Sequence, residues 1–302
     1  MFRFPIAPPA VATDAPAPVK GVLWMLVSAA ALAGLTGVVR HMSAGLPPFE
    51  IAFFRSFFGL LILAPWLMRS GLGVLRTKRL GLYTMRCVLG AATMLMWFTA
   101  ISMETLPLAD AVALGFTSPL FVILGAALFL GEVVRGRRLG VTLCGFAGAL
   151  IILRPGGGVL DPGAVLVLLS AVTLAGANLS VKELSRTEPV QAIVTYMVIF
   201  MVPLTFIPAL LVWQTPTPAQ LAELIGLAAV ATLGNYAMTR AVAVADASAV
   251  MPYDYARLPF VALIGFFVFG ETSDAATWIG AGVIAVASLY LAHHESKAEQ
   301  RR

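Results

Sequence analysis

The chain has 302 residues, of which 60% are hydrophobic and 12% are charged, and its mean hydropathy is +0.92. Soluble domains are about half apolar and about one quarter charged, so this composition excludes an ordinary soluble protein and indicates one that lies in a lipid bilayer. The net charge of +5 does not indicate nucleic-acid binding, because the basic residues occur in short groups between apolar segments. No metal or cofactor is expected.

Ten apolar segments follow a Pro- and Ala-rich stretch, residues 1–19, which we expect to be a disordered tail. A transmembrane helix needs about 20 apolar residues, and the breaks between the segments contain Gly, Pro and charged residues. We therefore predict an all-α integral membrane protein with ten transmembrane helices and a short C-terminal tail, residues 293–302. The predicted spans cover residues 20–41, 47–68, 79–102, 107–130, 136–153, 162–184, 189–212, 219–241, 247–269 and 275–292.

The distribution of Lys and Arg tests this number of spans. With the N-terminus in the cytoplasm, the cytoplasmic segments hold 15 of the 20 basic residues. Only Arg40 and Arg154 fall on the outer side, while Arg55, Arg86 and Arg257 lie within spans. Cytoplasmic segments of membrane proteins are enriched in Lys and Arg, so both termini are predicted to be cytoplasmic.

The sequence also contains an internal repeat. Residues 21–51 align without a gap to residues 163–193, and 11 of the 31 pairs are identical. Each half holds five predicted spans, and an odd number forces the second copy into the bilayer upside down. The chain is therefore predicted to form two inverted five-helix repeats, residues 20–156 and 157–292. Two inverted halves can exchange conformations around a central site, as a carrier requires. The repeat therefore favours a carrier over the alternative, a helix bundle that duplication produced without any transport function.

Arg55 lies eight residues into the second predicted span, too deep for a loop residue. A charge at mid-bilayer costs about 2.5 to 3.5 kcal/mol on insertion scales, so this side chain needs an acid or a water-filled pocket. Glu50, five residues earlier, does not share its helical face, and we expect a partner from another span, with Asp110 and Asp254 as candidates. Arg55 aligns with Met197 in the second half, so the site is expected to be asymmetric.

The ninth predicted span is the richest in functional groups. Pro252, Tyr253, Asp254, Tyr255 and Arg257 lie within six residues of one another. Asp254 and Arg257 are three residues apart and share a helical face. We expect a cavity wall on which Arg257 meets an anionic group and Asp254 a cation or proton. The alternative is a neutralised pair within one helix that only fixes helix packing.

Other spans contribute further candidates for lining the same cavity. Trp97 lies on the third span, Asn178 on the sixth, Tyr196 on the seventh and Asn235 on the eighth. Trp near a membrane interface is more often an anchor, which is the alternative for Trp97. Arg86, seven residues into the third span, fits either a side chain that reaches the cytoplasmic surface or one that lines the cavity.

Two glutamates and three prolines carry structural predictions. Glu132 and Glu271 end the fourth and ninth spans, and we interpret both as helix caps that accept hydrogen bonds from the next helix, not as substrate ligands. Pro119, Pro252 and Pro259 lie in these same two spans. A proline releases a backbone group and permits bending, so the three are hinge candidates, with static kinks as the alternative.

Six stretches of the chain together resemble the drug/metabolite transporter superfamily, specifically its ten-helix, EamA-type carriers. They are LPPFEIAFFRSFFGLLILAP (46–65), MRCVLGAATMLMWFTAI (85–101), LPLADAVALGFTSPLFVILGAALFLGE (106–132), RRLGVTLCGFAGALIILRPG (137–156), MPYDYARLPFVALIGFFVFGE (251–271) and WIGAGVIAVASLYL (278–291). The resemblance covers residues 20–292. It implies a core of spans 1 to 4 and 6 to 9 around a central cavity, with spans 5 and 10 outside it, where they support a homodimer.

We accordingly predict a secondary carrier that moves a small organic metabolite across the inner membrane by alternating access, without ATP. The resemblance implies an amino acid, or a nucleoside-like or flavin-like cofactor such as S-adenosylmethionine or riboflavin. Asp254, Asp110 and Glu104 are candidates for binding a coupling proton, and an uncoupled facilitator fits equally. The alternatives are a lipid-translocating or structural membrane protein and, less favoured, a membrane enzyme, because no metal-ligand spacing or phosphate-binding loop is present.

Overall fold

The computed structural model describes residues 17–70, 77, 79–129, 136–153, 161–244 and 250–299. Within these ranges every regular element is helical. Most of the expected N-terminal tail lies outside them. The first half contains α1 (Ala17–Met42), α2 (Pro48–Ser70), α3 (Leu80–Ser102), α4 (Leu108–Gly115), α5 (Ser118–Phe129) and α6 (Gly136–Leu153). The second half contains α7 (Pro162–Leu184), α8 (Val190–Leu210), α9 (Pro218–Val244), the 3₁₀ helix η2 (Met251–Ala256), α11 (Arg257–Phe269) and α12 (Ala275–Glu299).

Seven helical segments of the described residues are long and apolar enough to cross a membrane. They correspond to predicted spans 1 to 4 and 6 to 8. The other three predicted spans contain the shorter helices α6 and α11 and the apolar first half of α12. The chain is thus a multi-pass membrane protein, while the total of ten spans and the cytoplasmic position of both termini stay predictions.

Local sequence explains where several helices begin and end. Asp161 caps α7, because its side chain accepts a hydrogen bond from the Ala164 N–H at 3.1 Å, and Pro162 occupies the first helical position, where no N–H is needed. Gly270 ends α11 with φ at +67°, a left-handed conformation that a residue without Cβ adopts at little cost. Helix ends therefore coincide with the Pro- and Gly-rich breaks of the sequence.

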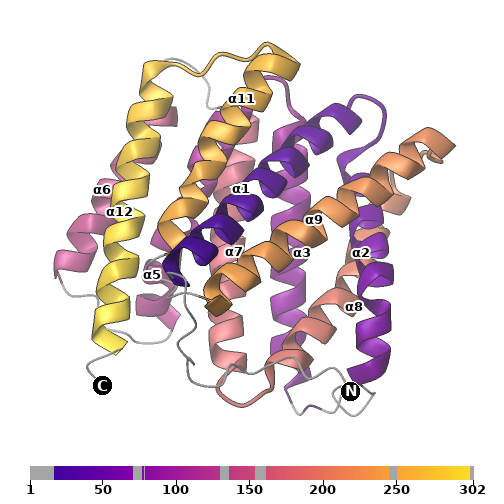
Figure 1. The fold of residues 1–302 in the computed structure, drawn as a ribbon, viewed down its shortest axis with the longest axis horizontal. Coiled ribbons are helices and arrows are strands. Elements are labelled where there is room, and N and C mark those ends of the chain that lie inside the picture. Colours follow the sequence, from indigo (N-terminus) through magenta and orange to yellow (C-terminus); the bar gives the residue numbers. More distant parts are fainter. Residues whose placement is uncertain are drawn as a thin grey trace.

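Equivalent helices of the two halves pack in equivalent pairs (Figure 1). α1 lies along α9, and its counterpart α7 lies along α3. α2 packs against its own counterpart α8, and α6 packs against its counterpart α12 at one edge of the bundle. This pattern is the one expected of two repeats related by a two-fold axis.

Small and hydroxylated residues lie where these helices meet, as is typical of helix contacts in membranes. Ser28 Oγ on α1 donates to the Gly234 carbonyl on α9 at 2.9 Å, and the hydroxyls of Thr93 on α3 and Thr173 on α7 are 2.8 Å apart. Backbones approach so closely between α6 and α12 that a Cβ added at Gly148 would lie 2.8 Å from the carbonyl oxygen of Gly280. A homodimer through these two peripheral helices stays a prediction.

Three expected helices differ in detail from the prediction. The fourth span is broken at Phe116 and Thr117, where the Thr117 hydroxyl donates to the Leu114 carbonyl at 2.6 Å just before Pro119. Pro119 has no N–H to donate to the preceding turn, so a continuous α-helix loses a bond there. The ninth span begins as 3₁₀ helix and becomes α-helical at Arg257, and α12 continues to Glu299 through the segment expected to be a tail.

Candidate functional site

Arg55 lies on α2 among sulfur and aromatic atoms. Its Nη1 donates to Met94 Sδ on α3 at 2.9 Å, and its guanidinium lies over the Phe98 ring, 6.0 Å from the centroid. Its Nε is buried and has no hydrogen-bond partner. A guanidinium has five N–H groups to donate, and a thioether sulfur is a weak acceptor, so most of this donor capacity is unused.

The two carboxylates expected as partners of Arg55 are engaged elsewhere. Asp110 accepts a hydrogen bond from the Thr277 hydroxyl at 2.8 Å, and Asp254 forms an ion pair with Arg257. Within the part of the chain that the structure describes, Arg55 contacts no carboxylate. The charge of Arg55 is thus left without a counter-ion from these residues.

Arg86 on α3 has a similar environment. Its Nη2 donates to Met197 Sδ on α8 at 3.3 Å, and its Nε is buried and unpaired. Gly90, one turn along α3, leaves room for the guanidinium, because an added Cβ would lie only 2.6 Å from Arg86 Nη1 and 3.9 Å from Met201 Sδ. We define the arginine–methionine cluster as Arg55, Arg86, Met94, Met197 and Met201.

An aromatic cluster lies between α2 and α8 toward the predicted outer end of the bundle. Phe53 on α2 contacts Phe206 on α8 with ring centroids 4.9 Å apart, and Trp213, just beyond α8, lies 5.6 Å from Phe54. Buried Glu50 reinforces the contact, because its Oε1 accepts a hydrogen bond from the backbone N–H of Gln214, the residue after Trp213. These side chains join the two repeats on one side of the arginines.

A second group joins the repeats toward the predicted cytoplasmic end. The rings of Tyr83 on α3 and Tyr196 on α8 lie 4.3 Å apart, and both are buried. The Tyr83 hydroxyl donates to Glu188 at 3.3 Å, and Thr77 donates to the other oxygen of the same carboxylate at 2.8 Å. Tyr196 precedes Met197 directly, so this contact adjoins the arginine–methionine cluster. The expected site residue Tyr196 is therefore part of a contact between the repeats.

The cluster of the ninth span divides into two parts. Arg257 Nη2 lies 2.7 Å from both carboxylate oxygens of Asp254, and its guanidinium lies 5.6 Å from the Phe116 ring centroid. Tyr255 packs on the same ring, with centroids 4.5 Å apart. Tyr253 is exposed. Arg257 is thus neutralised within its own helix, which is the geometry of the packing alternative, and its Nε is still unpaired.

Glu271 accepts a backbone N–H, but not from the helix that follows it. Its Oε2 accepts from Leu108 N, at the start of α4, at 2.7 Å, while its Oε1 lies 2.5 Å from Arg40 Nη1. Arg40 also donates to the carbonyls of Ile101 and Leu106. The start of α12 is capped instead by the preceding Asp274. The prediction that Glu271 caps the next helix is corrected, and Glu132 lies outside the described residues.

The remaining candidates do not converge on the arginines by any contact that the structure describes. The Trp97 ring packs near Gly115, where an added Cβ would lie 3.0 Å from it. Asn235 donates to the carbonyl of Ala231 in its own helix at 2.9 Å, and Asn178 is exposed on α7. The structure thus describes none of these three side chains in contact with Arg55 or Arg86.

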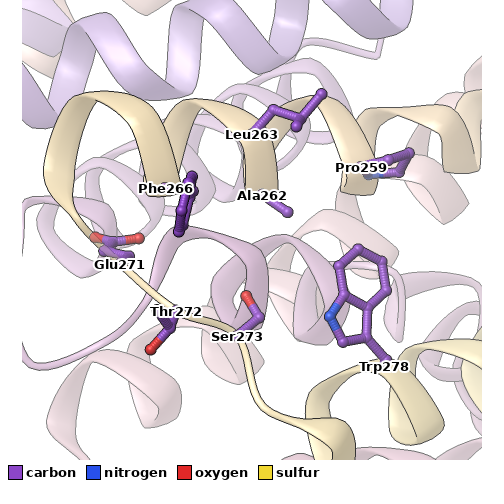
Figure 2. Close-up of a pocket in the computed structure, with 8 residues that line it drawn as sticks. All are labelled: Pro259, Ala262, Leu263, Phe266, Glu271, Thr272, Ser273 and Trp278. Carbon is purple, nitrogen blue, oxygen red and sulfur yellow. The ribbon is translucent and has the colours of Figure 1, made fainter.

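The proline candidates lie at helix boundaries. Pro119 follows the break between α4 and α5, Pro252 lies in η2, and Pro259 lies in the first turn of α11, where its ring needs no kink. Figure 2 shows that Pro259 and Trp278 face a pocket between α11 and α12, with Glu271 at its other end. The pocket has a volume of about 420 Å³ and is lined mainly by exposed apolar side chains.

A second pocket, about 540 Å³, lies between α6 and α12. Neither pocket is lined by the arginine–methionine cluster. A groove among apolar side chains on the outside of a membrane protein is filled by lipid at little cost, whereas a charge held within the bundle costs several kcal/mol until it is compensated. The arginine–methionine cluster is therefore the stronger candidate for a substrate site.

Sequence reasoning missed several residues that the structure brings together. Met94 and Met197 carry no signal of their own, because methionine is common in any apolar span. Arg40 did carry a signal in the sequence, because it aligns with Lys182 in the repeat. A cation therefore recurs at the end of the first span of each half. Glu50, at the third position of α2, is fully buried although it is an acid.

Comparison with known proteins identifies the relatives of this chain. The profile of the EamA-like transporter family matches it twice, at residues 19–154 and 161–292. A riboflavin transporter of Vibrio cholerae is 33% identical over 94% of this chain and 96% of that protein. An S-adenosylmethionine uptake transporter of Rickettsia bellii is 29% identical over 93% and 96% of the two chains.

A pseudopaline exporter of Pseudomonas aeruginosa is 34% identical over 90% of this chain and 95% of that protein. The names of these relatives describe transporters, not enzymes, and they name three different cargoes, with uptake in one case and export in another. The relatives therefore establish a metabolite transporter without fixing its substrate.

Proposed function

Because this chain belongs to the EamA-like transporter family, we propose that it is a secondary carrier that moves a small organic metabolite with a planar ring across the inner membrane. Transport proceeds by alternating access of two inverted repeats and without ATP hydrolysis. The observation that carries this proposal is the full-length similarity to a riboflavin transporter. Flavin-like and nucleoside-like cofactors are the favoured substrates.

Two features of the structure support this function. Contacts between the repeats lie on both sides of the arginine–methionine cluster: Phe53 with Phe206 toward the predicted outer end, and Tyr83 with Tyr196 toward the predicted cytoplasmic end. Alternating access requires contacts that form and break at each end in turn. Aromatic side chains next to hydrogen-bond donors also suit a planar ring with polar edges.

Purified protein in vesicles provides the test. Vesicles loaded with unlabelled riboflavin, S-adenosylmethionine or an amino acid are diluted into the labelled compound without ATP, and accumulation of label is followed. We expect saturable exchange of at least one ring-containing compound, and none in vesicles without protein. Failure of every compound to exchange, together with movement of a labelled phospholipid between leaflets, would replace the carrier with the lipid-translocating alternative.

A further inference from the structure

Four arginines of the described helices, one buried and three half-buried, fall into two classes. Arg40 pairs with Glu271 at 2.5 Å, and Arg257 pairs with Asp254 at 2.7 Å. Arg55 and Arg86 contact only thioether sulfurs and a ring among the described residues, and the Nε of each is buried and unpaired. Glu271 and Asp254 neutralise the first two cations, whereas no carboxylate of the described residues pairs with the second two.

Methionine sulfur cannot replace a carboxylate. A thioether carries no net charge and accepts hydrogen bonds weakly, so Met94 and Met197 orient the guanidiniums without compensating their charge. An arginine within the bilayer is normally paired or exposed to water, because its uncompensated charge is costly. A negatively charged ligand placed beside these two side chains would recover that cost as binding energy.

The two arginines and their sulfur partners lie at a contact between the two repeats. Arg55 and Arg86 belong to the first repeat, and Met197 and Met201 to the second. The Arg86 guanidinium lies beside Gly90, and Met94, which Arg55 contacts, is four residues further along α3, so the two guanidiniums lie at levels about 6 Å apart along the helix. Of the aromatic contacts between the repeats, Phe53 precedes Arg55 by two residues toward the predicted outer end, and Tyr83 precedes Arg86 by three residues toward the predicted cytoplasmic end.

From this we propose that the transported metabolite is an organic anion, and that Arg55 and Arg86 bind its carboxylate or phosphate group. The inference rests on the proposed carrier function and deepens it. Arg257 is excluded from this role, since Asp254 already holds its Nη2. A metabolite with an anionic group should bind more tightly than the same molecule without that group.

Two pairs of probes isolate the anionic group. Flavin mononucleotide differs from riboflavin only by a phosphate, and S-adenosylmethionine differs from its decarboxylated form only by a carboxylate. Each compound is tested as a competitor in exchange assays and as a stabiliser of the purified protein against heat. The vesicles are made of phosphatidylcholine, so that no anionic lipid competes for the arginines.

In the wild type we expect the anionic member of a pair to compete at about tenfold lower concentration, since a charged hydrogen bond contributes about 1.5 to 3 kcal/mol. Arg55→Gln and Arg86→Gln should each bring that ratio close to one, whereas Arg55→Lys, which keeps the charge, should preserve part of it. Equal competition by both members in the wild type, or an unchanged ratio in both glutamine variants, overturns the proposal.

Gly90 supplies a test that leaves both arginines in place. In Gly90→Ala the new Cβ would lie 2.6 Å from Arg86 Nη1, at the far end of a flexible side chain, so the guanidinium should move while the helix is kept. Gly81→Ala on the same helix is the matched control, because nothing lies within 4 Å of its added Cβ. The preference for the anionic probe should fall in Gly90→Ala and stay unchanged in Gly81→Ala.

The two proposals fail in different ways. Heat stabilisation by the anionic probes that depends on Arg55, without exchange of any probe, refutes the carrier and keeps the anion site. Exchange in which the preference for the anionic member of a pair is the same in the wild type, Arg55→Gln and Arg86→Gln refutes the anion site and keeps the carrier. Absence of both exchange and stabilisation refutes both.

Discussion

The ion pair of Asp254 and Arg257 holds a cation inside the bundle at the level of a broken helix. Both carboxylate oxygens lie 2.7 Å from Arg257 Nη2, and both side chains are largely buried. Phe116 lies beside the guanidinium, and Tyr255 packs on the same ring. The pair is therefore one element of a compact contact between the ninth and fourth spans, which is the geometry expected of a structural role.

Removing one partner of this pair should be worse than removing both. In Asp254→Asn the Arg257 charge loses its counter-ion, and we expect a loss of about 3 kcal/mol, as found when buried ion pairs are broken. The variant Asp254→Asn/Arg257→Gln leaves no uncompensated charge and should recover most of that loss. Thermal unfolding of the three proteins in one detergent measures the difference. A double variant as unstable as Asp254→Asn would contradict this account.

At the scale of elements, the breaks in the fourth and ninth spans are equivalent positions of the repeat. Gly131-Glu132 and Gly270-Glu271 end these spans with an offset of 139 residues, and the same offset relates Phe116 to Tyr255. The rings of these two equivalent residues lie 4.5 Å apart, at the break between α4 and α5 and at the change from η2 to α11. Contact between equivalent residues places them near the axis that relates the two halves.

The pairing of α6 with α12 depends on glycine. In Gly148→Ala the new Cβ would lie 2.8 Å from a backbone oxygen of α12, which cannot move as a side chain can. We expect a loss of about 1 to 3 kcal/mol, the usual cost of overpacking. Gly140→Ala, also on α6, is the control, since its Cβ would meet nothing within 4 Å. Thermal unfolding of both variants tests this.

Transport separates the role of this peripheral pair from that of the core. α6 and α12 lie at one edge of the bundle, away from α2 and α8 (Figure 1). Exchange per folded molecule should therefore be the same in Gly148→Ala as in the wild type. A selective loss of exchange without a loss of stability would place these helices in the transport pathway.

At the scale of the whole molecule, contacts between the halves tie both ends of the bundle. Arg40 and Glu271 join α1, the start of α4 and the end of α11 at the predicted outer end. Arg79 and Glu183 join α3 to α7 at the predicted cytoplasmic end, but at 3.4 Å and with about a third of each side chain exposed. The buried outer ion pair is the stronger of the two connections, because water screens the exposed one.

The predicted topology can be tested with single cysteines. After replacement of Cys87 and Cys144 by serine, Thr215→Cys lies in the exposed segment between α8 and α9, and Thr187→Cys in the exposed turn between α7 and α8. In intact cells a membrane-impermeant maleimide should label Thr215→Cys alone, and permeabilisation should expose Thr187→Cys. The distribution of Lys and Arg is the physical reason for this orientation. Labelling of both from outside would refute it.

The features that the sequence by itself determined are those that depend only on residues close together in the chain. Apolar runs, their Gly and Pro breaks and the internal repeat established a helical membrane protein and nearly all the helix boundaries, because spans are defined by their own residues in a bilayer. The position of Arg55 within a span was likewise visible in the sequence.

Only the tertiary structure decided which side chains meet. Arg40 and Glu271 are 231 residues apart in sequence yet form an ion pair, and Arg55 contacts Met94 instead of either expected carboxylate. Such contacts depend on how far each helix is rotated and shifted against its neighbours. A helix that is apolar on every face gives no sequence pattern from which this rotation could be predicted. The identity of the helix that Glu271 caps follows from packing alone.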